Sequence, residues 1–136
     1  MIVVDTNIIS YFYISSDRSD LAEKLLTKDP QWKAPVLWRS EFRSVLRQYL
    51  RKELLQLDEI LIILQQAEKL MHDGEYGITS NQVMQLVNSS TCSAYDCEFV
   101  ALAQHLNVPL ITEDKKVVRE FPKIAMSVDS FFSRPV

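Results

Sequence analysis

Three acidic side chains stand where a parallel α/β fold would bring them to one place. Asp5 directly follows the β-branched apolar run Ile2–Val4, and Asp114 follows a second apolar run that ends at Thr112. Asp96 lies in the first turn of a predicted helix that leads into the second run. Because strand carboxyl ends and helix N-termini share one edge of a parallel sheet, we expect these three carboxylates to meet there.

Glu41 is the fourth candidate. On the helix predicted after Pro35 it lies three residues after Trp38 and four before Val45, which places it on the apolar face. Asp96 lies on the apolar face of its own helix in the same way. A carboxylate on such a face is costly unless it is paired or binds a metal. No Lys or Arg stands three or four residues from either acid, so an external cation is the simplest partner.

Carboxylates and water are ligands that suit Mg²⁺ or Mn²⁺ rather than Zn²⁺. The two histidines, His72 and His105, are far apart and lack ligand spacing, and Cys92 and Cys97 are expected to be reduced, small buried side chains. We therefore expect one or two Mg²⁺ or Mn²⁺ ions. The predicted catalytic and metal-binding residues are Asp5, Glu41, Asp96 and Asp114.

Each of these acids also has a purely structural interpretation. Asp5 could cap the helix that follows it, and Asp96 could be the partner of Ser93 in a capping box. Asp114 could be a turn residue, and Glu41 could pair with a distant Arg. Four such coincidences at one sheet edge are less economical than a shared site.

The neighbouring acid Glu113 could replace or assist Asp114. In an extended chain, successive side chains point to opposite sides. We favour Asp114 as the residue of the site for this reason.

The composition limits the class of protein. The chain has 136 residues, 47% hydrophobic and 24% charged, which predicts one folded domain over residues 1–136 and excludes a disordered chain. No run approaches the roughly 20 apolar residues of a membrane span. The only glycines, Gly74 and Gly77, exclude the glycine-rich loops that bind dinucleotides and nucleotide phosphates. The net charge of −3 excludes a strongly basic coat, and no signal peptide is visible, so we expect a cytoplasmic protein.

Short apolar runs alternate with amphipathic helical segments, which predicts an α/β fold. We expect a parallel central sheet of about four to five short strands with helices on both faces. The expected strands are Met1 to Val4, Trp32 to Ala34 (as a strand or an extended connection), Val108 to Thr112 and Ile124 to Ser127. The expected helices are Asn7 to Ile14, Ser19 to Thr27 with Ser19 as N-cap, one after Pro35, Leu57 to His72 ending at a C′ Gly74, one through Val87, Ser93 to Leu106, and Lys115 to Glu120. A tail turn is expected at Ser130 to Phe132.

Four segments in this order resemble the PIN-domain ribonuclease family, most closely its toxin branch of the VapC type. They are VDTN (Val4 to Asn7), WRSEFRSVL (Trp38 to Leu46), SAYDCEFVALA (Ser93 to Ala103) and PLITEDKKV (Pro109 to Val117). The resemblance spans nearly the whole chain and implies a PIN-like fold with Rossmann-like layering. Cys97 departs from the family by standing where alanine is common, and the segment before Ser93 is a weak strand.

Carried over by position, the family's metal-binding acids fall on the four carboxylates named above. Asn7 and Thr112 match its further polar positions, and Asn7, Ser93 and Thr112 would support the metal ligands through hydrogen bonds. The resemblance also implies cleavage of single-stranded or loop RNA with Mg²⁺ or Mn²⁺, a homodimer, and a small antitoxin partner.

These inferences predict an endoribonuclease that hydrolyses RNA to 5′-phosphate and 3′-hydroxyl ends, with Arg39, Arg43 and Lys115 binding RNA. The alternative is a catalytically silent module that binds RNA or a protein. Aspartate-based phosphatases need a second Asp where Asn7 stands, and receiver domains need an acidic pair after the first strand. A final pattern lies outside the site, where leucines at helical spacing predict core or a partner surface: Leu54, Leu57, Leu61 and Leu64.

Overall fold

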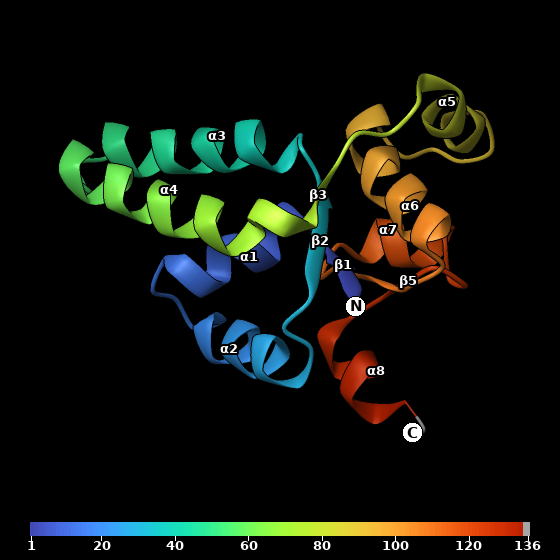
Figure 1. The fold of residues 1–136 in the computed structure, drawn as a ribbon, viewed down its shortest axis with the longest axis horizontal. Helices are drawn as coiled ribbons and strands as arrows, with labels where there is room; N and C mark the ends of the chain where they lie inside the picture. Colours follow the sequence, from blue (N-terminus) through green and yellow to red (C-terminus); the bar gives the residue numbers. More distant parts are fainter. Residues whose placement is uncertain (135–136) are drawn as a thin grey trace.

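The computed structural model describes residues 1–134, so the last two residues of the predicted domain lie outside the described part. A five-stranded parallel sheet runs through the molecule in the order β3-β2-β1-β4-β5 (Figure 1). The strands are β1 Ile2–Val4, β2 Trp32–Pro35, β3 Glu75–Tyr76, β4 Leu110–Ile111 and β5 Ala125–Met126. The predicted parallel sheet is confirmed.

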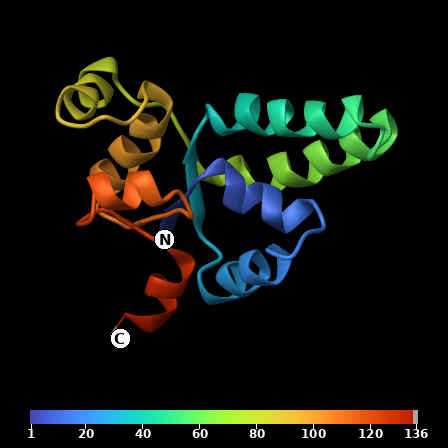
Figure 2. The same ribbon diagram turned by 180° about the vertical axis from the view of Figure 1, so that it is seen from behind.

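Helices cover both faces of this sheet, as predicted (Figures 1 and 2). The helices α1, α3 and α4 pack together on one side, while α5 and α6 pack on each other and α6 lies against β1 and β2 on the other side. Their bounds are α1 Thr6–Tyr13, α2 Ser19–Lys28, α3 Trp38–Arg51, α4 Leu57–Met71, η1 His72–Gly74, α5 Ser80–Asn88, α6 Ala94–Leu106, α7 Lys115–Glu120 and α8 Val128–Ser133.

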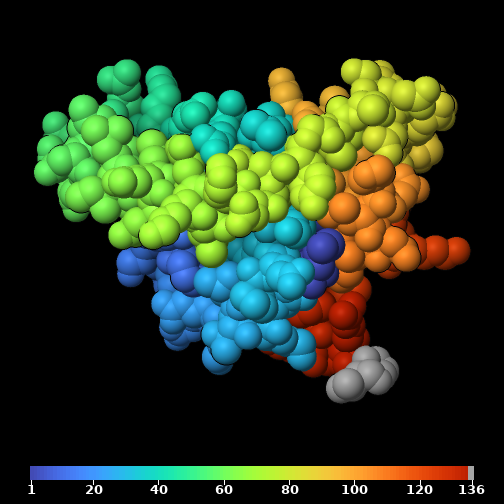
Figure 3. Space-filling model, viewed as in Figure 1, coloured from blue at the N-terminus to red at the C-terminus, as the bar shows by residue number. Residues whose placement is uncertain are grey.

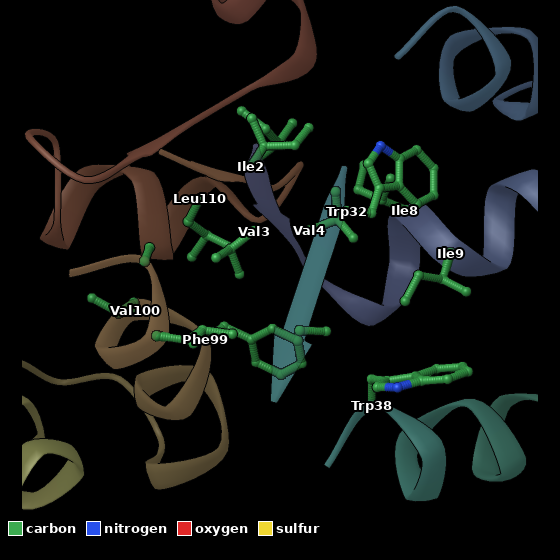
Figure 4. Close-up of a cluster of buried hydrophobic side chains, with 14 of the residues drawn as sticks. Ile2, Val3, Val4, Ile8, Ile9, Trp32, Trp38, Phe99, Val100 and Leu110 are labelled. Atoms are coloured by element: carbon green, nitrogen blue, oxygen red, sulfur yellow. The ribbon is translucent and has the colours of Figure 1, made fainter. Parts of the chain in front are cut away.

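The core forms around the central strand β1. All three residues of Ile2–Val4 are fully buried, which is why the run is β-branched throughout and not alternating. Phe99 and Val100 from α6 lie on one side of β1, whereas Ile8 and Ile9 from α1 lie on the other (Figure 4). Burial on both faces fixes β1 between two helical layers, and its carboxyl end therefore opens between them.

The helices α3 and α4 form a hairpin that projects to one side of the sheet (Figures 1 and 3). A capping box between Gln56 and Glu59 begins α4. The leucines predicted as core or partner surface divide here. Leu54, Leu57 and Leu61 are more than half exposed, so the core interpretation is wrong for these three.

The strands are shorter than the apolar runs predicted, and two elements differ in kind. β4 and β5 contain two residues each, although backbone hydrogen bonds continue from Thr112 to Met126 and from Leu110 to Ile124. β3 was not predicted, since two partly buried residues carry no strand signal. The expected tail turn is the short helix α8. None of the helices in residues 1–134 is long and apolar enough to span a bilayer.

Two local predictions are wrong for identifiable reasons. Ser19 does not cap α2, because the N-cap position is Arg18 and the Ser19 hydroxyl instead donates to the Ile14 carbonyl. Gly74 is not a left-handed C′ residue, since no glycine among the described residues has positive φ. It is required because a Cβ there would lie 2.2 Å from the Trp32 carbonyl oxygen, where η1 crosses β2.

Candidate active site

A pocket of about 290 Å³ opens at the carboxyl edge of the sheet, between the two helical layers. All four predicted acids line it, together with Asn7 and Thr112. The lining comprises Asp5, Thr6, Asn7, Glu41, Ser44, Val45, Gln48, Asp96, Phe99, Leu110, Thr112, Asp114 and Val117. Side chains from α1, α3, α6, α7 and the end of β4 therefore converge, although 109 positions separate Asp5 from Asp114 in sequence.

Sheet register brings Asp5 and Thr112 side by side. Val4 of β1 pairs with Ile111 of β4, so the next residue of each strand leaves the sheet at the same level. The Thr112 hydroxyl donates to Asp5 Oδ2 and accepts from the Asp114 backbone N–H at 3.0 Å. One buried hydroxyl thus connects two of the four acids.

Asp5 and Asp114 also cap helices, so the structural interpretation of each holds alongside the functional one. Asp5 Oδ1 accepts from the Ile8 N–H at 3.1 Å at the start of α1. Asp114 Oδ1 accepts from the Lys116 and Val117 N–H groups at the start of α7. Capping fixes where these carboxylates stand while leaving both on the pocket surface.

Glu41 is held by a neighbouring helix of the same layer. The Thr6 hydroxyl donates to Glu41 Oε1 at 2.7 Å, which links the first turn of α1 to α3. No Arg pairs with Glu41 among the described residues, so the predicted alternative of a distant ion pair is not found. Its second oxygen, Oε2, accepts no hydrogen bond from residues 1–134.

Asp96 lies one turn into α6, where Ser93 is the N-cap. The Ser93 hydroxyl accepts from the Asp96 N–H at 3.0 Å, which is one half of the predicted capping box. The reciprocal bond from the Ser93 N–H to the Asp96 carboxylate is missing among the described hydrogen bonds. Asp96 therefore reaches the pocket, while Ser93 is not among its lining residues.

Burial and mutual repulsion act on the acids together. Burial raises the pKa of Asp5 to about 6, and the charges of Asp114 and Glu41 add to this, against hydrogen bonds from Thr112 and the Ile8 N–H. Burial likewise raises the pKa of Glu41, with contributions from Asp96 and Glu98, while the bond from Thr6 opposes it. The pocket thus disfavours the charged forms of Asp5 and Glu41.

The donor set fits a hard divalent cation. Four carboxylates face one pocket, and none of them forms an ion pair with a basic side chain in residues 1–134. Oxygen ligands of this kind suit Mg²⁺ or Mn²⁺. As the side chains stand, no three His, Cys, Asp or Glu residues of the described chain converge as ligands.

Glu113 has a separate role, in keeping with the choice of Asp114. Its Oε1 accepts from the Val128 N–H at 3.1 Å, and its carboxylate lies 3.7 Å from Arg18. Glu113 is absent from the pocket lining, whereas Asp114 belongs to it. The alternation of side chains after Thr112 thus separates a structural acid from a pocket acid.

The three predicted RNA-binding residues have different surroundings. The Arg39 guanidinium donates to Glu75 at 2.6 and 2.8 Å and to Glu68 at 2.8 Å, and would have to give up these bonds before binding a phosphate. Arg43 and Lys115 are exposed and form no ion pair within residues 1–134. Lys115 directly follows Asp114, and Arg43 lies two residues after Glu41.

Sequence reasoning missed three polar residues of the pocket. Thr6 is buried and bonds Glu41, although its place beside Asp5 gave no sign of that distant partner. Ser44 and Gln48 line the pocket three and seven residues after Glu41. That spacing places both on the same helix face, so this signal was available.

The cysteines lie outside this site. Cys92 and Cys97 are buried free thiols, as predicted, and burial raises the pKa of both. Neither lines the pocket.

The chain is similar in sequence and in fold to known proteins. A curated relative, Ribonuclease VapC3 of Pyrobaculum aerophilum, is 25% identical over 126 residues, which are 90% of this chain and 96% of the relative. The solved structure of PAE2754 from Pyrobaculum aerophilum has a TM-score of 0.72 at 15% identity and covers 96% of this chain and 92% of its own. The fold therefore extends over the full length of these relatives.

Two further solved structures share the fold. FitAcB from Neisseria gonorrhoeae has a TM-score of 0.67 at 15% identity, covering 94% of this chain and 98% of its own. A toxin–antitoxin complex from Klebsiella pneumoniae has a TM-score of 0.67 at 18% identity, with the same coverage. The family model of the PIN domain matches residues 2–124, which include all four pocket acids. This chain belongs to the PIN domain family.

Proposed function

We propose that this protein is a metal-dependent endoribonuclease that hydrolyses RNA to 5′-phosphate and 3′-hydroxyl ends. The observation that carries the proposal is the pocket in which Asp5, Glu41, Asp96 and Asp114 stand together without a basic partner among the described residues. Membership of the PIN family and the similarity to a curated ribonuclease support it. The pocket would then bind a cation, and the cation would bind a phosphate of the RNA.

The acids would hold one or two Mg²⁺ or Mn²⁺ ions. Asp5, Asp96 and Asp114 are the proposed ligands, and Glu41 either binds a second ion or orients the attacking water. When bound, the divalent cation supplies a water of lowered pKa and neutralises charge on the phosphate. Asn7 and Thr112 line the pocket and are proposed to support the ligands, and Ser93 does so through the start of α6.

We propose that Glu41 acts on the attacking water. Thr6 donates to its Oε1, which leaves Oε2 to accept a hydrogen bond from the nucleophile. The water oxygen would form the new bond to phosphorus, the bond from phosphorus to O3′ would break, and the leaving O3′ would take a proton.

We further propose that the protein is the toxin of a type II toxin–antitoxin pair in the cytoplasm, and that it forms a homodimer. The Klebsiella toxin–antitoxin complex shares the fold, which supports a small antitoxin partner. The exposed leucines of the α3–α4 hairpin offer apolar area for either contact. Arg43 and Lys115 are the proposed RNA contacts of the free enzyme, and Arg39 joins them only if its ion pairs open.

The test is cleavage of total cellular RNA by the purified, partner-free protein in Mn²⁺ or Mg²⁺. EDTA and the Asp96→Asn variant run alongside, and the product ends are sequenced. Discrete cuts with 5′-phosphates that both controls abolish would support the proposal. Products with 2′,3′-cyclic phosphate would exclude water as nucleophile, and a folded protein that binds RNA without cutting it would indicate the silent module.

A further inference from the structure

The pocket continues beyond the acids along one face of α3. Glu41, Ser44, Val45 and Gln48 all line it, at spacings of three, four and seven residues. At a rise of 1.5 Å per residue, the backbone of Gln48 lies roughly 10 Å along the helix axis from that of Glu41. This wall is within reach of a nucleotide next to a phosphate that binds at the acids.

The wall has the chemistry of a surface that binds bases. Ser44 and Gln48 are exposed, and neither side chain forms a hydrogen bond with any residue of 1–134. A glutamine amide carries donors and an acceptor, and a hydroxyl carries both, so both groups can form hydrogen bonds with a base edge. Val45 and Phe99 add apolar surface to the same pocket.

We propose that Gln48, assisted by Ser44, determines the base preference of the cleavage reaction. Gln48 binds the edge of the nucleotide beside the cleaved bond, and Val45 contacts its face. The amide can pair with an adjacent donor and acceptor on a base edge, so we expect one base to be preferred over the others. This inference rests on the proposed nuclease function.

The experiment is deep sequencing of cleavage products from a randomised unstructured RNA. It compares the wild type with Gln48→Ala and Ser44→Ala, and uses Gln65→Ala, an exposed glutamine of α4 outside the pocket, as the matched control. We expect the wild type to prefer one base at a position next to the cut. Gln48→Ala should reduce that discrimination roughly 10-fold, Ser44→Ala less, and Gln65→Ala not at all.

Binding provides a readout that does not depend on turnover. Short fluorescent RNAs that differ at the preferred position are titrated with Asp96→Asn protein, with and without Gln48→Ala. If cleavage occurs and Gln48→Ala leaves both preferences unchanged, the inference is overturned while the nuclease function stands. If the wild type cuts nothing but Gln48→Ala abolishes a base preference in binding, the proposed chemistry fails and the role of Gln48 in recognition stands.

Discussion

Arg39 and Glu41 stand two residues apart on α3, yet their charges meet opposite surroundings. Arg39 points to Glu75 and Glu68, which lie 36 and 29 residues away, and forms ion pairs with both. Glu41 points to the pocket, where its neighbours are three more acids and its only described side-chain bond comes from neutral Thr6. One face of α3 thus contributes to an ion-paired cluster of Arg39, Glu68 and Glu75, and another face carries a pocket acid without a basic partner.

The ion-paired cluster stabilises the fold. Glu75 accepts from Trp38 Nε1 at 2.8 Å as well as from Arg39, and the two donors hold the pKa of Glu75 below its usual value, the Arg39 bond most strongly. The N-cap of α3 has no side-chain hydrogen bond, so this cluster fixes the start of the helix against β3. Charges that form ion pairs within the fold contribute to stability, whereas carboxylates without a basic partner remain able to bind a ligand.

The largest expected effect is on the acids of the pocket. Asp5→Asn should reduce RNA cleavage at least ~100-fold, because it removes a proposed metal ligand. It should leave the thermal midpoint unchanged or raise it, since Asn also caps helices and removes both the cost of burying a charge and the repulsion from the other acids. Cleavage rates and thermal unfolding check both parts, with Asp129→Asn, an exposed acid of α8, as the matched control. Full activity of Asp5→Asn would remove Asp5 from the site.

A change in the ion-paired cluster should lower stability, in contrast to the change in the pocket. Glu75→Ala should lower the free energy of unfolding by about 2 kcal/mol, because it leaves Trp38 Nε1 without its acceptor and Arg39 with one partner fewer. Urea unfolding measures this change, and Glu23→Ala on an exposed part of α2 is the control. An unchanged unfolding midpoint would show that the cluster does not stabilise the helix start.

The burial of Asp5, together with repulsion from Asp114 and Glu41, predicts a pH dependence of stability. The native pKa of Asp5 lies above its ordinary value of 3.8, at about 6, so the native state binds this proton more tightly than the unfolded state. The contribution of Asp5 to stability is therefore fully present below pH 3.8 and is lost as pH rises through about 6.

Unfolding in EDTA across this pH range measures the effect. The wild type should lose stability relative to Asp5→Asn as the pH rises, and Mg²⁺ should restore it more at pH 7 than at pH 5. A constant difference between the two proteins would contradict the raised pKa of Asp5.

The smallest expected effect separates the two arginines. Arg43→Ala should weaken RNA binding modestly and reduce the slope of log affinity against log salt by about one, because it removes one phosphate contact. Arg39→Ala should mainly lower stability and should leave the salt slope little changed, since its guanidinium is already paired. Fluorescence titrations at several salt concentrations measure the slope for both variants. A reduced slope for Arg39→Ala, with no reduction for Arg43→Ala, would show that the ion pairs of Arg39 open for RNA.

Much of the fold follows from local pattern. The buried run Ile2–Val4 could only be a central strand, and the spacing of Trp38, Phe42 and Leu46 could only be one face of a helix. The positions of Asp5 and Asp114 at strand ends follow from the same patterns. Their catalytic role stays a prediction.

Contacts between distant residues could not be predicted in this way. β3 has too few residues for a pattern, and it forms because Ala34 and Pro35 present a free sheet edge to Glu75 and Tyr76. The need for Gly74 comes from the Trp32 carbonyl, 42 residues earlier, and not from its own backbone angles.

The sequence by itself determined which residue types were available, which segments would be buried, and that no Lys or Arg stands three or four residues from Glu41 or Asp96. The tertiary structure alone decided which charges would form ion pairs. It paired Arg39 with Glu75 and Glu68, whereas among the described residues Glu41 accepts from the Thr6 hydroxyl, and Asp5 accepts from the Thr112 hydroxyl and the Ile8 N–H. The reason is physical: electrostatic neutralisation depends on distances of a few ångströms, and packing sets those distances between residues that are remote along the chain.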